Sequence, residues 1–179
     1  MKRWAAFLRG MNVGGHRVTN AELRGVFDGL SLAEVGCFRA SGNVVFEAEG
    51  GREALRARIE AALEDSLGYA VPTFLRSADE LRAIAAHDPF PATAVRASAG
   101  KLQVVLLLEP PSASARRELL GRSTDEDRVV VAERELYWLP SGGLMESSFD
   151  WKAVAGLIGP TTVRTKGTVE QMTKKYLAA

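Results

Sequence analysis

The chain has little of what several classes of protein need. Cysteine is nearly absent, because Cys37 is the only one in 179 residues, and this excludes an intramolecular disulfide and a cysteine-based metal cage. Histidine is also scarce, since only His16 and His87 carry an imidazole, and no metal site is predicted. No apolar run reaches membrane-spanning length, and the apolar part of the N-terminal segment is too short for a signal peptide. We therefore expect a soluble, cytoplasmic protein without membrane association.

The chain also lacks a strong charge of either sign. Lys and Arg number 23 and Asp and Glu 22, so no global field draws the protein to nucleic acid or to an anionic membrane. The stretch from Gly42 to Phe46 is similar to the end of an RNA-recognition signature, but Ser41 and Asn43 stand where stacking aromatic residues are needed. We predict no nucleic-acid partner. The acidic stretch 123–127 is interpreted as a solvated loop, because no calcium-loop pattern follows it.

Two segments stand out, and each joins an apolar strand to a glycine-marked polar turn. The first covers residues 7–15 (FLRGMNVGG) and the second residues 40–46 (ASGNVVF). Neither matches a motif whose chemistry is fixed. The first lacks the Gly-Lys-Ser/Thr ending of a P-loop, its glycines do not have the dinucleotide-binding spacing, and no nucleophile elbow occurs in the chain. The residues alone therefore identify no reaction.

The first half of the chain reads as β-α-β-β-α-β. Thr19 and Glu22 form a capping box that opens a helix, and Ser41-Gly42-Asn43 is typical of a tight hairpin. Pro72 cannot donate to a ladder, so the strand around it is expected at a sheet edge. The expected strands are residues 4–8, 35–38, 44–46 and 71–75, and the second helix covers 55–67.

The same order of elements then recurs with little residue identity. Ser77 and Glu80 are expected to cap a further helix through His87, and the proline-containing segment 88–100 is expected to be a linker. Strands are predicted at 101–108, 128–132, 136–139 and 161–164, helices at 112–120 and 150–158, and a terminal helix capped by Thr168 with Gln171.

The pattern predicts an α+β protein of two ferredoxin-like subdomains in tandem, each an antiparallel sheet with helices on one face. The first subdomain is expected at 1–87 and the second, with the C-terminal helix, at 101–179. In this topology the strand order is 4-1-3-2, so the loop after the first strand and the hairpin between the second and third emerge at one edge of the sheet. The two glycine-marked turns should therefore be neighbours.

This edge is the predicted ligand site, and an anion is the expected guest. Glycines let backbone N–H groups turn toward one point, and the helix that follows Thr19 adds a positive dipole end. Arg9 is expected at the end of a buried strand, where a guanidinium needs a partner. The turns alone also explain the glycines, and Asn12 is equally a turn former. The predicted contacts are Arg9, Gly10, Asn12, Gly14, Gly15, Ser41, Gly42 and Asn43.

At residues 8–15, 21–24 and 41–46 the chain resembles the domain-of-unknown-function 1697 family, which is uncharacterised and mostly bacterial. The resemblance implies two ferredoxin-like subdomains and no established activity. The chain departs from the family pattern at Ala40, where a glutamine is usual, and at Thr165, where an asparagine is usual. Residues 143–148, with Glu146, also replace a common basic Ser-Lys pair.

Positive charge gathers near the C-terminal end at Arg164, Lys166, Lys174 and Lys175. A solvated helix surface explains Lys174 and Lys175. Arg164 and Thr168 coincide with positions that the resemblance implies are kept, and we predict that they face the groove between the halves and complete the anion site.

Three functions stay open from the sequence. The leading hypothesis is a binding protein for a small anionic or phosphorylated ligand, with no cofactor. An enzyme, a hydrolase or transferase, is the second, and its only candidate groups are His16, Ser41 and Thr168. A protein-interaction or structural module is the third. The oligomeric state is not determined by any of these patterns.

Overall fold

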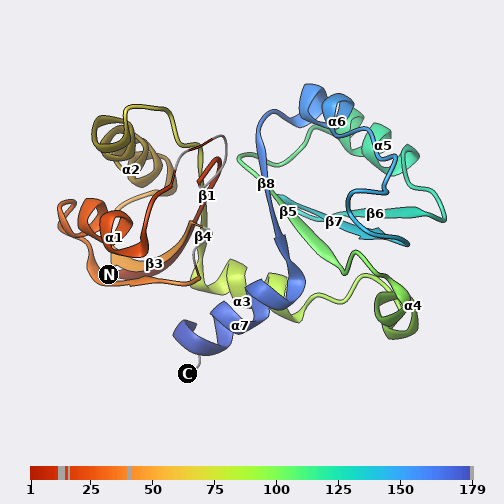
Figure 1. The fold of residues 1–179 in the computed structure, drawn as a ribbon, viewed down its shortest axis with the longest axis horizontal. Coiled ribbons are helices and arrows are strands. Elements are labelled where there is room, and N and C mark those ends of the chain that lie inside the picture. Colours follow the sequence, from red (N-terminus) through yellow and green to blue (C-terminus); the bar gives the residue numbers. More distant parts are fainter. Residues whose placement is uncertain (12–14, 16, 40–41, 178–179) are drawn as a thin grey trace. The chain divides into compact units, whose positions relative to one another are not determined.

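The computed structural model describes residues 1–11, 15, 17–39 and 42–177 (Figure 1). The chain divides into two compact units. Unit 1 consists of Met1–Ala83 together with the chain from Met172 onward, and unit 2 is Ile84–Gln171. The two boundaries fall inside helices α3 (Ala78–Ala86) and α7 (Lys166–Leu177). None of the described helices is long and apolar enough to span a membrane.

Unit 1 has the predicted β-α-β-β-α-β order. Its sheet runs β2-β3-β1-β4 with every neighbouring pair antiparallel, so β1 and β3 are central and β4 is an edge strand, as Pro72 predicts. Helices α1 and α2 lie together on one face of this sheet (Figure 1). The elements are β1 Lys2–Leu8, α1 Asn20–Asp28, β2 Ala33–Cys37, β3 Asn43–Ala48, α2 Arg52–Leu67 and β4 Thr73–Ser77.

Short local signals set the helix ends of unit 1. The capping box at α1 is confirmed, because the Glu22 N–H donates to Thr19 Oγ1 at 3.2 Å and the Thr19 N–H donates to Glu22 Oε2 at 2.7 Å. Ser77 and Glu80 exchange the equivalent bonds at the start of α3. Helix α2 ends at Gly68, whose φ of 79° is accessible to glycine without strain.

Both faces of the central strand β1 are buried. Leu8 packs in the core under α1 and α2, where the rings of Phe27 and Phe46 lie 5.7 Å apart. Ala5 and Phe7 point to the opposite face and are buried as well. This explains why residues 4–8 form a continuous apolar run instead of an alternating pattern.

Unit 2 repeats the topology. Its sheet runs β6-β7-β5-β8, again all antiparallel, with α5 and α6 on one face (Figure 1). The core beneath them contains Val105, Leu136 and Trp138. The two predicted ferredoxin-like subdomains are therefore present. The elements are β5 Gln103–Leu107, α5 Ala113–Gly121, β6 Asp127–Val131, β7 Glu135–Pro140, α6 Trp151–Ile158 and β8 Thr161–Thr165, and a short helix, α4 Ala92–Ala97, lies in the expected linker.

The terminal helix differs from its prediction in where it begins. The sequence predicts Thr168 as the cap, but α7 starts at Lys166, and the Thr168 N–H donates to Thr165 Oγ1 at 3.1 Å. The side chain of Lys166 is buried, and its Nζ donates to Ala85 O at 2.9 Å and pairs with the carboxylates of Asp88 and Glu170. These bonds fix the start of the helix three residues earlier than the local pattern indicates.

The last turns of α7 group with unit 1, although the sequence places the whole segment 101–179 in the second half. The hydroxyl of Tyr176 donates to Cys37 O at 3.0 Å, and Arg3 Nη1 donates to Tyr176 O at 2.8 Å. Arg82 likewise donates to Leu177 O. The end of the chain is thus bonded to β1, β2 and α3 of unit 1.

Candidate functional site

The loop after β1 and the β2–β3 hairpin meet at one edge of the first sheet, as the topology predicts. The Leu8 N–H donates to Gly42 O at 2.8 Å, although the two residues are far apart in the chain. Met11 packs on the same glycine, because a Cβ built on Gly42 would lie 2.8 Å from Met11 Cγ and 3.0 Å from Leu8 Cβ. The two glycine-marked segments are therefore in direct contact.

The three described glycines of this edge differ in the space around them. Gly42 has a φ of 68° and no room for a side chain, so both its backbone conformation and its packing require it. Gly10 has a φ of 79° and Gly15 a φ of 89°, but a Cβ on either would meet nothing within 4 Å. The first glycine fixes how the segments pack, whereas the other two leave open space beside the backbone.

The buried side chain of Asn43 stabilises the hairpin through hydrogen bonds. Its side chain is fully buried, and its Nδ2 donates to Phe38 O at 3.1 Å while the Phe38 N–H donates to Asn43 O at 2.9 Å. These bonds close the end of the hairpin. A direct contact of Asn43 with a ligand stays a prediction, because in this structure the amide has a structural role.

Arg9 lies on the surface, which corrects the expectation of a buried guanidinium. Burial ends at Leu8, and the Arg9 N–H makes the last rung of the β1–β4 ladder by donating to Pro72 O at 3.0 Å. No desolvation penalty therefore forces a partner on this side chain. It is instead an exposed cation beside the open backbone of Gly10.

The N-terminus of α1 attracts an anion less than the sequence suggests. Hydrogen bonds from the backbone and side chain of Thr19 lower the pKa of Glu22, and its carboxylate sits at the positive end of the helix. This negative charge compensates the dipole locally.

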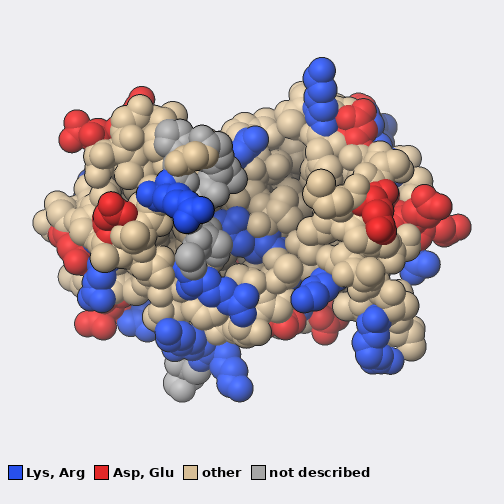
Figure 2. Space-filling model, in the orientation of Figure 1, with Lys and Arg blue, Asp and Glu red and all other residues tan. Residues whose placement is uncertain are grey.

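Cations surround the hairpin end. Arg39 is exposed, with a φ of 58°, and its guanidinium carbon lies 5.5 Å from the centre of the Phe38 ring. Lys175 Nζ lies 5.9 Å from the same ring and 5.0 Å from that of Tyr176. Figure 2 shows that, on the part of this face belonging to unit 1, Lys and Arg gather near the hairpin, while Asp and Glu lie further out.

The remaining predicted site residues either lie outside the described residues or belong to unit 2. Asn12, Gly14, His16 and Ser41 lie outside the described residues. Arg164 and Thr168 belong to unit 2, and their joining the edge of unit 1 stays a prediction.

Arg164 and Thr168 are bonded locally within unit 2. Arg164 Nη1 donates to Thr162 Oγ1 and to Val163 O, each at 2.8 Å. Burial lowers the pKa of Arg164 to about 10, so the guanidinium stays protonated at pH 7. The hydroxyl of Thr168 lies 2.8 Å from that of Thr165.

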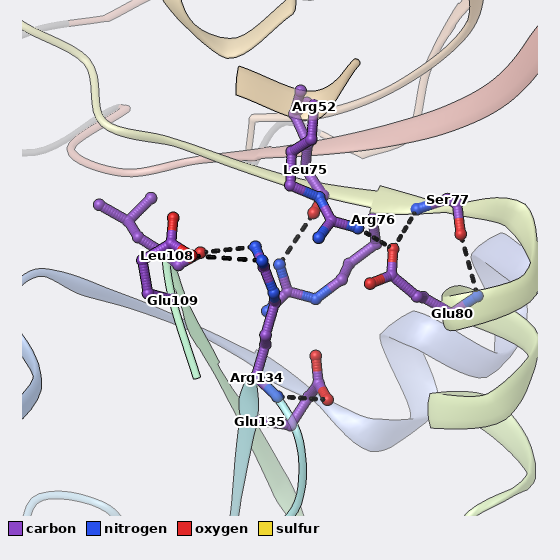
Figure 3. Close-up of polar contacts among 9 residues, drawn as sticks. All are labelled: Arg52, Leu75, Arg76, Ser77, Glu80, Leu108, Glu109, Arg134 and Glu135. Atoms are coloured by element: carbon purple, nitrogen blue, oxygen red, sulfur yellow. Dashed lines mark hydrogen bonds and ion pairs between the residues drawn. The ribbon is translucent and has the colours of Figure 1, made fainter. Parts of the chain in front are cut away.

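Sequence reasoning missed a cluster of charged residues at the end of β4, of which Arg76 is buried and Arg52 and Glu80 are partly exposed. The side chain of Arg76 is 1% exposed, and its Nη1 donates to Leu75 O at 2.9 Å (Figure 3). Glu80 accepts from Ser77 N and pairs with Arg52. Burial raises the pKa of Glu80, but the bonds from Ser77 and Arg52 and the charge of Arg76 outweigh it and leave the pKa lowered. The capping box signalled Glu80, but nothing local signalled its arginine partners.

Unit 2 has a partly buried arginine, Arg134, in the turn of the β6–β7 hairpin. Arg134 Nη1 donates to Leu108 O at 2.9 Å, and its other terminal nitrogen lies 3.2 Å from Glu109 Oε2 (Figure 3). This pairing ties the end of β5 to the β6–β7 turn. It is a structural contact within the unit.

The fold and the glycine-marked edge together define a protein of two ferredoxin-like units, each with its own core. The chain belongs to the family described as "Protein of unknown function (DUF1697)", whose model matches residues 1–137. No curated protein matches it. Among solved structures it is similar to the conserved bacterial protein SP0830 from Streptococcus pneumoniae, with 19% identity, a TM-score of 0.75, and 99% of each chain covered. A likeness at this identity concerns the fold alone.

Proposed function

We propose that unit 1 binds a small anionic ligand, such as a nucleotide or a phosphorylated metabolite, at the edge formed by the Arg9–Gly15 loop and the hairpin end at 41–43. The observation that carries the proposal is the direct contact of the two segments through Leu8 and Gly42. The first segment carries Arg9 and Gly10, and the hairpin carries a second exposed cation, Arg39, directly before the second segment.

The chemistry of the edge favours phosphate over a neutral ligand. Arg9 and Arg39 are both exposed, and a guanidinium binds phosphate oxygens through two parallel N–H donors. Gly10 and Gly15 have open space on the side where a side chain would otherwise stand, so a ligand can approach the backbone closely. Glu22 opposes binding with its charge, which places the preferred ligand position on the Arg9 side of the loop.

The free thiol of Cys37 fits a reducing compartment, and we include a cytoplasmic location in the proposal. The expected ligand classes are abundant there, so binding does not require secretion.

Isothermal titration calorimetry with inorganic phosphate, ATP and a sugar phosphate tests the proposal, combined with the same titrations of Arg9→Ala. We expect saturable binding that weakens with salt, and a loss of about tenfold or more in affinity for Arg9→Ala. Arg58→Ala removes another exposed arginine, from α2, and serves as the matched control, because it lowers the charge of the protein by the same amount. Equal affinities for the two variants, or no binding of any anion, would contradict the proposal.

A further inference from the structure

Unit 2 has a cavity of about 200 Å³ where β6 begins and β7 ends. Its polar lining consists of three carboxylates and three hydroxyls, from Glu126, Asp127, Glu146, Ser141, Ser147 and Ser148. None of the described lining residues is basic. Figure 2 shows Asp and Glu side chains gathered on the part of the drawn face that lies over β6.

Asp127 is the unusual member of this lining. Its residue is only 4% exposed, and its Oδ1 accepts from Trp138 Nε1 and from Ser147 Oγ, each at 2.7 Å. Its Oδ2 accepts no hydrogen bond from any residue that the structure describes. This oxygen lines the cavity, so it can accept a hydrogen bond from water or from a ligand that enters there.

The surrounding backbone holds this carboxylate in place. Thr124 and Asp127 exchange two hydrogen bonds, the Asp127 N–H to Thr124 Oγ1 at 2.9 Å and the Thr124 N–H to Asp127 O at 3.0 Å. Ser147 Oγ accepts from Phe149 N at 3.1 Å while it donates to Asp127. The interpretation of 123–127 as a solvated loop is therefore wrong for Asp127, which is the first residue of β6.

The lining also restricts the class of ligand. A metal ion is poorly suited, because Oδ1 is already occupied by two donors and the described residues contain no group of three or more metal-ligating side chains placed to hold one. A nucleotide or other large ligand is too big, since pockets for such molecules measure roughly 300–1,000 Å³. An ammonium or guanidinium head group fits, because it carries a positive charge and three to five N–H donors.

We propose that this cavity binds the head group of a small organic cation, an alkylammonium or a guanidinium. Asp127 Oδ2 accepts the central charge-assisted hydrogen bond, and the carboxylates of Glu126 and Glu146 add attraction at the rim. The site lies within unit 2 and prefers the opposite charge from the edge of unit 1, so it is independent of the proposed anion site.

Trp138 provides a direct readout, because its indole N–H is bonded to the same carboxylate. The experiment is a titration of the ¹⁵N-labelled full chain with agmatine, which carries both head groups, followed at the indole N–H resonance of Trp138. Urea, the neutral analogue of guanidinium, and sodium chloride at matched ionic strength are the control titrants. We expect a saturable shift with agmatine and none with either control.

Variants then assign the binding to the cavity. Asp127→Asn keeps an acceptor for the Trp138 indole but removes the negative charge. Glu146→Gln removes a negative charge from an exposed residue, so it should not disturb the packing of unit 2. We expect affinity to fall about tenfold or more for the first and several-fold for the second. Glu133→Gln, an exposed carboxylate on the β6–β7 turn, should leave it unchanged.

Three results would overturn the assignment: no saturable shift, an equal shift with urea or salt, or unchanged affinity in Glu146→Gln and Asp127→Asn. If Asp127→Asn does not fold, Glu146→Gln alone decides, because its side chain lies on the surface. A calcium titration distinguishes a metal from an organic cation, and a tighter effect of calcium than of agmatine would also overturn the proposal.

Discussion

At the scale of single residues, Glu80 connects helix capping to an ion pair. The same carboxylate oxygen accepts from the Ser77 N–H at 2.8 Å and pairs with Arg52 Nη2. Both bonds favour the ionised form, and they explain why the pKa of Glu80 is lowered despite partial burial. One side chain therefore fastens the start of α3 to the start of α2.

Glu80→Gln should destabilise the protein by about 1 kcal/mol at pH 7, since it weakens a capping box and removes a partly exposed ion pair. The folded-state pKa lies below the ordinary value of 4.5, so this stability is present above pH 4.5 and is lost as the pH falls through the folded-state pKa. Urea denaturation at pH 7 and at pH 3 measures both values. The difference should shrink at the lower pH, and a constant difference, or one matched by the exposed control Glu64→Gln, would refute the explanation.

The glycines of the candidate edge give a second prediction at this scale. Gly42→Ala should cost about 2–4 kcal/mol, because it adds left-handed strain to a clash with Met11 and Leu8. Gly10→Ala has the same kind of φ but open space, so it should cost only about 1 kcal/mol. Chemical denaturation of both variants checks the order. Equal losses would mean that the hairpin does not pack on the loop as described.

At the scale of elements, side chains cover the outward backbone groups of the edge strands. The β6–β7 register turns the backbone N–H and C=O groups of Val129 and Val131 away from β7. The Val129 N–H nevertheless donates to Ser123 Oγ at 3.0 Å, and Val131 O accepts from Arg116 Nη1 at 2.8 Å. In β4 the Thr73 N–H donates to Glu60 Oε1 at 2.8 Å. Such bonds block pairing with strands of other chains.

Arg116→Ala should uncover the β6 edge. We expect a loss of about 1–2 kcal/mol, from two carbonyls deprived of a charged donor, and faster aggregation on heating. The neighbouring exposed residue offers the control Arg117→Ala, which removes the same charge without touching β6. Light scattering during thermal ramps compares the two, and indistinguishable curves would argue against edge protection.

Elements with local signals were predictable, and contacts distant in sequence were not. The capping boxes at Thr19 and Ser77 involve residues three apart, so the sequence reveals them. The start of α7 was misplaced because Lys166 is fixed by Ala85 and Asp88, which are far away in the chain. The buried position of Asp127 depends in the same way on Trp138 and Ser147, and a local acidic run gives no sign of it.

At the scale of the whole molecule, two units with little sequence identity share one topology. The order of elements and the apolar patterning of the strands suffice to specify each sheet, which is why the fold was predictable without a known function. The boundary between the two units was harder to predict from the sequence, because the end of α7 is bonded to unit 1. The chain thus returns to its first unit after completing the second.

The variant Tyr176→Phe tests whether the last turns of α7 stabilise unit 1. The hydroxyl bonds Cys37 O at 3.0 Å on the edge strand β2, so its removal should destabilise unit 1 by about 1 kcal/mol and increase hydrogen exchange at β2. Amides of β5 to β7 in unit 2 should keep their protection. Uniform loosening of both units would contradict the assignment of the terminal turns to unit 1.

An NMR titration of the ¹⁵N-labelled protein with ATP and with inorganic phosphate shows whether the edge formed by the Arg9–Gly15 loop and the hairpin end binds an anion. We expect saturable shifts concentrated at the amides of Gly10, Gly15 and Gly42, which are abolished by Arg9→Ala and kept in Arg58→Ala. No saturable shift, or shifts concentrated in unit 2 and unaffected by Arg9→Ala, would contradict the proposal.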